Sequence, residues 1–200
     1  MTAEFSDCER FRYSLSEVWE TERPLVMFLM MNPSVAGPEH ADPTLIKTGK
    51  YARAWGYGGQ LVGNVHAYRV TDSGLLVEAE DRGKAAAHAE RPLDAVIIEH
   101  CYAAGGLTWP AGVPALLDEH NIESDYHRQR AEQARSPRLA IEYLGWRRFE
   151  RAVWQRVSGV AVVCEKDARA VTRVRRAPAC IAENAVDGRR YTFKPPSQRR

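Results

Sequence analysis

Three apolar runs in the second half of the chain each end abruptly in polar residues, and this repeated pattern constrains the fold more than any other feature. The runs and their polar endings occupy residues 115–124, 160–167 and 181–187, and the first contains His120-Asn121-Ile122-Glu123. A short, continuous apolar run is typical of a buried parallel strand, and open α/β sheets bind ligands at the carboxyl ends of such strands. The pattern therefore predicts an α/β sheet whose polar groups gather at one edge.

Strand and helix signals alternate along the whole chain. The predicted strands are residues 24–31, 60–69, 95–99, 115–119, 160–164 and 179–183, and the predicted helices are residues 45–55, 140–158 and 166–173. Continuous apolar runs indicate the strands, and apolar residues at three- and four-residue steps indicate the longer helices. This alternation favours an α/β fold with a mainly parallel sheet and helices on both faces, a Rossmann-like three-layer arrangement.

The composition is that of an ordinary globular domain, with 44% hydrophobic and 27% charged residues among 200. The formal net charge of +2 gives no overall argument for nucleic-acid binding, and the modest excess of arginine in the last third is typical of a solvated surface. The longest apolar run, residues 25–31, is too short to span a bilayer, and early acidic residues argue against a signal peptide. We therefore expect a cytoplasmic protein without a membrane span, and its oligomeric state stays open.

The cysteines and histidines do not form a metal-binding pattern. The four cysteines are widely spaced and include no Cys-x-x-Cys pair, so we expect free thiols in a reducing compartment rather than a structural zinc site. Asp118, Glu119 and His120 are adjacent, but alternate residues of a strand face opposite ways. The sequence therefore predicts no metal site and no cofactor.

The composition changes between residues 77 and 90, where charged residues and alanines replace the apolar runs. We interpret this change as a boundary between two structural units. It divides the chain into a partial α/β unit at residues 1–80, a linker or surface helix at residues 81–91, and a second partial α/β unit at residues 92–200. On this interpretation the chain is a composite, and each half carries a functional signal of its own.

Four separate blocks carry the signal of the first half. They are residues 28–34 (Phe-Leu-Met-Met-Asn-Pro-Ser), 42–44 (Asp-Pro-Thr), 55–59 (Trp-Gly-Tyr-Gly-Gly) and 64–72 (Asn-Val-His-Ala-Tyr-Arg-Val-Thr-Asp). Together they resemble the bacterial and phage domain-of-unknown-function family 1643 (DUF1643), in which an apolar strand runs into Leu-Asn-Pro-Ser and the other blocks follow in this order. The resemblance covers about residues 11–76, and Ala41 and Val65 depart from the family pattern.

These blocks also support a hypothesis about the ligand. Asn32 and Asn64 follow two predicted parallel strands, so their amides can meet at one sheet edge, where paired donors and acceptors suit a nucleobase. Asp42 can position a water or a hydroxyl, and Arg69 completes the set. A looser similarity to folds of the uracil-DNA-glycosylase type is an analogy in the same direction. The alternative is that Asn32 and Asp42 only organise turns through their side chains.

A second set of blocks lies within residues 92–196. It comprises a strand into His120-Asn121-Ile122-Glu123, Arg-Phe-Glu at residues 148–150, a strand into Cys-Glu-Lys-Asp at residues 164–167, and Asn-Ala-Val-Asp at residues 184–187. This order resembles the N-terminal, acceptor-binding domain of family 4-type glycosyltransferases of the GT-B fold. The resemblance implies retaining sugar transfer from a nucleotide sugar, as co-substrate, to a small-molecule or glycan acceptor.

The same resemblance implies a role for each block. His120 would be the catalytic residue, near the reacting sugar and hydrogen-bonded to one of its hydroxyls. Asn121 and Glu123 would shape the acceptor side. Glu165 would complete the substrate site from a helix start, where a carboxylate meets the positive end of the helix dipole, although capping alone explains it equally well. Asn184 would fix the crossover to a further domain.

The chain departs from the glycosyltransferase pattern at Cys164, where serine is usual, and at Ala185, where glycine is usual. The residues that grip the nucleotide in such enzymes belong to a further domain outside this chain. We therefore expect a glycosyltransferase-like protein that is incomplete on its own. Two alternatives stay open: a nucleobase- or nucleic-acid-associated protein acting through Asn32, Asp42, Asn64 and Arg69, or a non-enzymatic α/β remnant.

Overall fold

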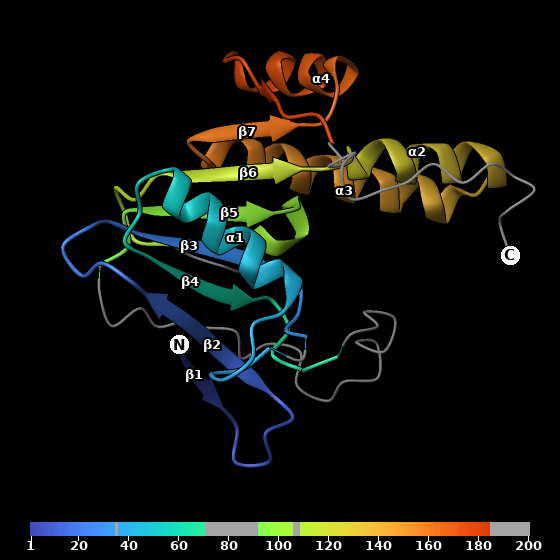
Figure 1. Cartoon of the computed structure of the whole chain (residues 1–200). Coiled ribbons are helices and arrows are strands. Elements are labelled where there is room, and N and C mark those ends of the chain that lie inside the picture. The colour runs from blue at the N-terminus through green and yellow to red at the C-terminus, as the bar shows by residue number, and fades with distance from the viewer. Residues whose placement is uncertain (35, 71–91, 106–108, 185–200) are drawn as a thin grey trace, which may run out of the picture.

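A computed structural model describes residues 1–34, 36–70, 92–105 and 109–184, and within these residues eight strands form one mostly parallel sheet (Figure 1). In chain order the strands are β1 (Thr2–Phe5), β2 (Arg12–Val18), β3 (Leu25–Met30), β4 (Gly59–Asn64), β5 (Ala95–Glu99), β6 (Ala115–Glu119), β7 (Gly159–Val162) and β8 (Cys180–Ile181). Their order across the sheet is β1-β2-β4-β3-β5-β6-β7-β8. The predicted α/β class is therefore confirmed.

Strands β4, β3, β5, β6, β7 and β8 run parallel to one another, so their carboxyl ends lie along the same edge. Strands β1 and β2 extend the sheet beyond β4 as an antiparallel pair. The order reverses at β3: the chain moves from β3 to β4 on one side and continues with β5 on the other. Such a reversal is the point where open α/β sheets bind their ligands.

Strand β3 joins the two halves of the chain into one sheet, because it pairs with β4 on one side and with β5 on the other. Two hydrogen bonds align the amino ends of β3 and β5. The Asp94 amide donates to the Leu25 carbonyl oxygen at 3.0 Å, and the Leu25 amide donates to Asp94 Oδ2 at 2.7 Å. The linker that the sequence predicts at residues 81–91 lies outside the described residues.

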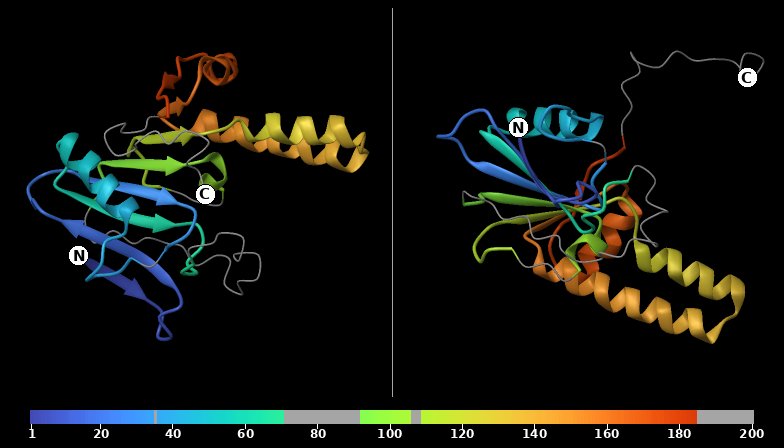
Figure 2. Two further views of the ribbon diagram at one scale, coloured as in Figure 1. Left: turned by 45° about the vertical axis from the view of Figure 1, so that its right-hand side comes forward. Right: turned by 90° about the horizontal axis from the view of Figure 1, so that it is seen from below.

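The described helices cover both faces of the sheet (Figure 2). They are α1 (Pro43–Ala54), the short 3-10 helix η2 (Cys101–Ala104), α2 (Glu123–Ala134), α3 (Pro137–Arg156) and α4 (Glu165–Arg175). On one face α1 packs Leu45 and Ala52 against strands β2, β3 and β4. On the other, α3 and α4 pack Val153, Trp154 and Val171 against β5, β6 and β7. The three-layer prediction is therefore confirmed.

Helix α1 begins and ends with recognisable signals. Asp42 Oδ1 accepts a hydrogen bond from the Leu45 amide at 2.8 Å, so Asp42 is its N-cap, and Pro43 is the first helical residue. After the helix, Gly56 has a φ of +87°, a conformation that glycine adopts without a steric penalty. The helix therefore ends at Ala54, two residues before this glycine.

Helices α2 and α3 form an antiparallel hairpin that extends past the carboxyl ends of the strands (Figures 1 and 2). Helix α2 buries only Ser124, and α3 buries only Glu150, Val153 and Trp154 near its end. The sequence predicts α3 at residues 140–158 but treats residues 125–138 as a polar segment, because α2 has no apolar face. None of the helices in the described part of the chain is both long and apolar enough to cross a membrane.

Candidate functional site at the carboxyl edge of the sheet

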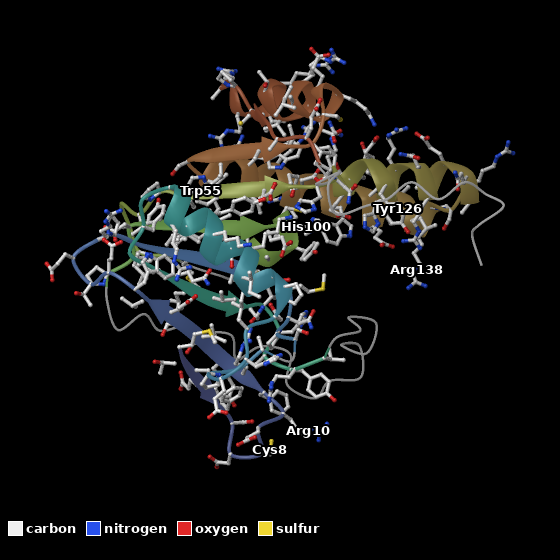
Figure 3. All side chains as sticks on the ribbon, viewed as in Figure 1. Cys8, Arg10, Trp55, His100, Tyr126 and Arg138 are labelled. Carbon is white, nitrogen blue, oxygen red and sulfur yellow. The ribbon has the colours of Figure 1, made fainter. Side chains whose placement is uncertain are left out.

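Polar side chains gather where β5 and β6 end, next to the reversal in strand order. Glu99 is the last residue of β5 and pairs in register with Asp118 of β6. The next residue along, His100, donates its amide hydrogen to the Asp118 carbonyl oxygen at 2.9 Å. In Figure 3, His100 lies where the sheet edge meets the base of the α2–α3 hairpin. The strand register therefore brings the two strand ends together.

The side chains at these strand ends form one cluster, which we call the histidine cluster: Glu99, His100, Asp118 and His120. The imidazole rings of His100 and His120 are 4.5 Å apart between centroids and tilted by 50°. His120 Nε2 lies 3.3 Å from Asp118 Oδ2, and the His120 side chain is 36% exposed. The cluster is thus partly shielded but open to a ligand.

Burial shifts the pKa values of His100 and Glu99. It lowers the pKa of His100, and the neighbouring His120 lowers this pKa further, because two adjacent imidazoles disfavour two positive charges. Burial also raises the pKa of Glu99. His100 is therefore neutral at physiological pH and offers one donor and one acceptor nitrogen.

His100 is held in an unusual backbone conformation, with φ of +64° and ψ of 147°. This region is sparsely populated by residues other than glycine, and such conformations concentrate at functional sites. Its Nδ1 atom is buried and has no hydrogen-bond partner. On its other side the ring stacks on Tyr102, with centroids 5.0 Å apart. A ligand that bonds Nδ1 would supply the missing partner.

Three members of the cluster could also hold a metal ion. Glu99, His100 and His120 each offer a ligand atom, and these atoms all lie within 4.8 Å of one another. Imidazole nitrogens with a carboxylate oxygen suit zinc and related divalent metals. The sequence predicts no metal site, because the spacing of these residues along the chain gives no metal-binding motif.

A buried polar network lies directly beneath the cluster. Glu119 is 0% exposed and accepts hydrogen bonds from the Cys101 amide at 2.9 Å and from Trp154 Nε1 at 3.2 Å. Burial raises the pKa of Glu119 to about 8. Glu150, also 0% exposed, accepts from the amide and the hydroxyl of Ser124, and burial raises its pKa too. The network ties β6 to η2, α2 and α3, and so positions the strand end that carries His120.

Cys101 completes a second trio of potential metal ligands with Glu119 and Glu150, and all three are buried. Burial raises the pKa of the Cys101 thiol, and the neighbouring carboxyl groups raise it further. Cys101 and Glu119 also share a hydrogen bond, from the Cys101 amide to Glu119 Oε2 at 2.9 Å, so this trio belongs to the buried network described above. Cys101 is a buried free thiol.

The remaining residues predicted from the glycosyltransferase resemblance lie around this edge without joining the cluster. Asn121 is exposed in the turn after β6, and Glu123 is the first, half-buried residue of α2. Glu165 is exposed at the start of α4, where it pairs with Arg169 at 3.2 Å. Asn184 is exposed beyond β8, at the end of this described segment. Among all the residues predicted from the glycosyltransferase resemblance, only His120 belongs to the histidine cluster.

Asn64 is one of the residues predicted to bind a nucleobase, and it forms a hydrogen bond with a residue that the sequence analysis does not single out. Asn64 lies buried at the end of β4, and its Oδ1 accepts a hydrogen bond from Arg12 Nη2 at 3.1 Å. Arg12 is 3% exposed, also donates to the Ala36 carbonyl oxygen at 3.0 Å, and has an Nε atom without a partner. Burial lowers the pKa of Arg12 to about 10. No pattern marks Arg12 in the sequence, because it begins a short strand among polar residues.

Asn32 and Asp42 organise the chain around them, as the alternative reading of the sequence holds. Asn32 Nδ2 donates to the Val70 carbonyl oxygen at 2.6 Å and to that of Pro33 at 3.3 Å. Asp42 caps α1. Arg69 Nη1 donates to the Glu9 carbonyl oxygen at 3.0 Å, and its guanidinium lies over the Phe5 ring. Only Asn64 of this set joins a fully buried polar pair.

Comparison with known proteins bears on the first half of the chain. No curated protein and no solved structure matches the chain. One family model does match, and it is described as "Protein of unknown function (DUF1643)". Its match runs from β2 to just beyond η2, so it includes Arg12, Asn64, Glu99 and His100. It thus extends past residue 92, where the glycosyltransferase resemblance begins. Over residues 12–106 the chain is therefore similar to DUF1643, as its N-terminal blocks predict.

Proposed function

We propose that this protein is glycosyltransferase-like and binds a sugar at the histidine cluster. The observation that supports this most is the contact between His100 and His120, with ring centroids 4.5 Å apart, beside the reversal in strand order. Ligands of open α/β sheets bind outside the carboxyl ends of the strands at such a reversal. The contact joins a strand from the DUF1643-like range to one from the glycosyltransferase-like range.

The chemistry of the cluster suits sugar hydroxyls, which both donate and accept hydrogen bonds. With Asp118 as acceptor, His120 Nε2 carries the hydrogen and leaves Nδ1 to accept from a hydroxyl. Glu99 adds a further polar group, because its carboxylate lies within 4.8 Å of ligand nitrogens of His100 and His120.

We propose sugar transfer as the reaction class and acceptor binding as the role of this chain. In such a transfer the bond from the anomeric carbon to the donor phosphate breaks, and the acceptor oxygen bonds that carbon. The acceptor proton leaves with the nucleotide phosphate.

Substitution of the two histidines tests the proposal. We expect His120→Ala and His100→Ala to weaken sugar binding by about tenfold each, since each removes a hydrogen bond in a partly shielded site. His40→Ala is the matched control, because His40 is exposed and remote in sequence from the cluster. Binding would be followed by saturation-transfer NMR with UDP-glucose, GDP-mannose and free hexoses. Equal binding by the wild type and all three variants would refute the proposal.

The Arg12–Asn64 pair favours a second candidate, nucleobase binding by the DUF1643-like range. Arg12 occupies the amide oxygen of Asn64, which fixes the amide and leaves its NH2 group as the donor for a base carbonyl. We expect Asn64→Asp to weaken binding of uridine, and binding of single-stranded DNA to fall as salt rises. Flat titrations at low salt with both ligands would exclude this candidate.

A further inference from the structure

A groove of about 400 Å³ opens between the α2–α3 hairpin and α4. It begins at Ile122 and Ser124, just after the end of β6, and reaches Lys166 and Asp167, just after the end of β7. It therefore continues the carboxyl edge of the sheet away from the histidine cluster, and Ile122 is only two residues beyond His120. A cavity of this size accommodates a small ligand.

Positive charge dominates the lining of this groove. It includes five cationic side chains, from Arg128, Arg147, Arg151, Lys166 and Arg173, against two carboxylates, from Asp125 and Asp167. Lys166 Nζ and Arg128 Nη2 both bind Asp125, at 2.6 and 2.7 Å. The Lys166–Asp125 pair spans from α4 to α2, so it holds the two sides of the groove together and neutralises Asp125.

The other three cations have no acidic partner in the described part of the chain. Arg147 and Arg151 are one turn apart on α3, and Arg173 approaches from the last turn of α4. No carboxylate oxygen of the described residues lies within 4.0 Å of these three guanidinium groups. From the sequence, the excess of arginine in the last third of the chain is typical of a solvated surface. In the fold, these three arginines line the same groove.

Guanidinium groups converging from two helices favour a phosphate, because each can donate two parallel hydrogen bonds to its oxygens. The rest of the lining includes Ile122, Tyr143 and Trp154, and aromatic and aliphatic surfaces suit the ring of a sugar. We propose that the groove binds a phosphorylated sugar, with its phosphate on Arg147, Arg151 and Arg173. The binding of a phosphorylated sugar does not depend on the proposed function. The further claim that this sugar is the acceptor in sugar transfer does rest on the proposed function.

Calorimetric titration of the full chain tests the binding, with glucose 6-phosphate, inorganic phosphate and glucose as probes at low salt. We expect glucose 6-phosphate to bind more tightly than phosphate, and glucose to bind least. Arg147→Gln and Arg151→Gln should each raise the dissociation constant for glucose 6-phosphate by about tenfold. Added salt should weaken binding of both phosphate probes, because the groove is open to solvent.

Two matched controls lie on the same helices. Arg148 is exposed between the two test residues on α3 but does not line the groove, and Arg169 lies one turn before Arg173 on α4. Arg148→Gln and Arg169→Gln should bind glucose 6-phosphate as the wild type does, and circular dichroism would establish that all variants fold. Equal losses in test and control variants, or no binding of any phosphate probe, would overturn the proposal. So would a single-stranded oligonucleotide that binds tighter than glucose 6-phosphate and loses affinity in the same variants.

His120→Ala separates this inference from the proposed function. That variant should lose binding of unphosphorylated hexoses at the histidine cluster but keep phosphate binding within about twofold. If His120→Ala binds hexoses as the wild type does, while Arg147→Gln and Arg151→Gln still lose phosphate affinity, the cluster does not bind sugar but the proposal for the groove is supported. If phosphate affinity instead follows His120 and ignores the arginines, the groove proposal is wrong.

Discussion

Two adjacent residues at the end of β6 have opposite surroundings, because side chains alternate along a strand. Glu119 points into the core and is 0% exposed, whereas the His120 side chain is 36% exposed at the site. The buried carboxyl group bonds η2 through the Cys101 amide and α3 through Trp154. The geometry of the histidine cluster therefore depends on a carboxyl group that no ligand can reach.

Glu119 should make the stability of the fold pH-dependent. Its folded pKa is about 8, above the ordinary value of 4.5 for a glutamate side chain, so the folded state holds the proton more tightly than the unfolded state. The contribution of Glu119 is then complete below about pH 4.5 and is lost as the pH rises towards 8. We expect the free energy of unfolding of the wild type, relative to Glu119→Gln, to fall by on the order of 3 kcal/mol between pH 5 and 8.

Urea denaturation at several pH values would measure this difference. Glu22→Gln is the control, because Glu22 is exposed and its removal should leave the pH dependence of the wild type unchanged. Burial also raises the pKa of Glu150, so the free energy of unfolding of Glu119→Gln should still depend on pH to some extent. Parallel curves for the wild type and Glu119→Gln would show that Glu119 is ionised in the folded protein.

Among the elements, α1 depends on Asp42, the residue for which the sequence leaves two roles open. Its carboxylate bonds the Leu45 amide at 2.8 Å, so Asp42→Ala should lower the free energy of unfolding by about 1 kcal/mol, whereas Asp42→Asn should retain most of it, because asparagine caps equally well. Thermal and urea denaturation would compare the two variants. Equal losses in both would mean that the charge of Asp42, rather than its capping bond, stabilises the fold.

The elements differ in how far their sequences reveal them. Strands β5 and β6 have the predicted bounds, because both are short apolar runs between polar residues. Helices α3 and α4 are also predicted. Helix α2 is not, because a helix that buries only Ser124 has no apolar periodicity to detect. Strand β4 ends at Asn64 rather than at Arg69, since the amides of Val65 and His66 bond the carbonyl groups of Met30 and Met31 as the chain turns.

The site is less predictable than the strands that carry it. His120 follows an apolar run and stands out in the sequence, whereas His100 and Arg12 do not. Both acquire their importance from partners far along the chain: His100 from His120, and Arg12 from Asn64, 52 residues away. Such contacts depend on which strands become neighbours, and local patterns do not determine that order.

At the scale of the whole molecule, residues before and after 71–91 share one sheet, with β3 paired to both β4 and β5. Separating residues 1–80 from 92–200 would leave the edges of β3 and β5 unpaired and would divide the core cluster that contains Leu29, Leu61 and Ile98. We therefore expect neither piece to fold alone and co-expression to restore a folded complex.

Circular dichroism and heteronuclear NMR of each purified piece would test this expectation. The intact chain, unfolded by urea under the same conditions, supplies the reference for a cooperative transition. A cooperative unfolding transition in residues 92–200 alone would contradict it and would show that the second half is a self-sufficient unit.

The pair of hydrogen bonds between Leu25 and Asp94, at the end of the sheet opposite the site, governs how the two segments are aligned. Because neighbouring positions of a strand face opposite ways, a slip of β5 by one residue would turn His100 away from His120. The four residues of the histidine cluster are therefore not enough to form it without the correct strand register. We therefore expect Asp94→Ala to weaken sugar binding at the histidine cluster, although every residue of the cluster is unchanged.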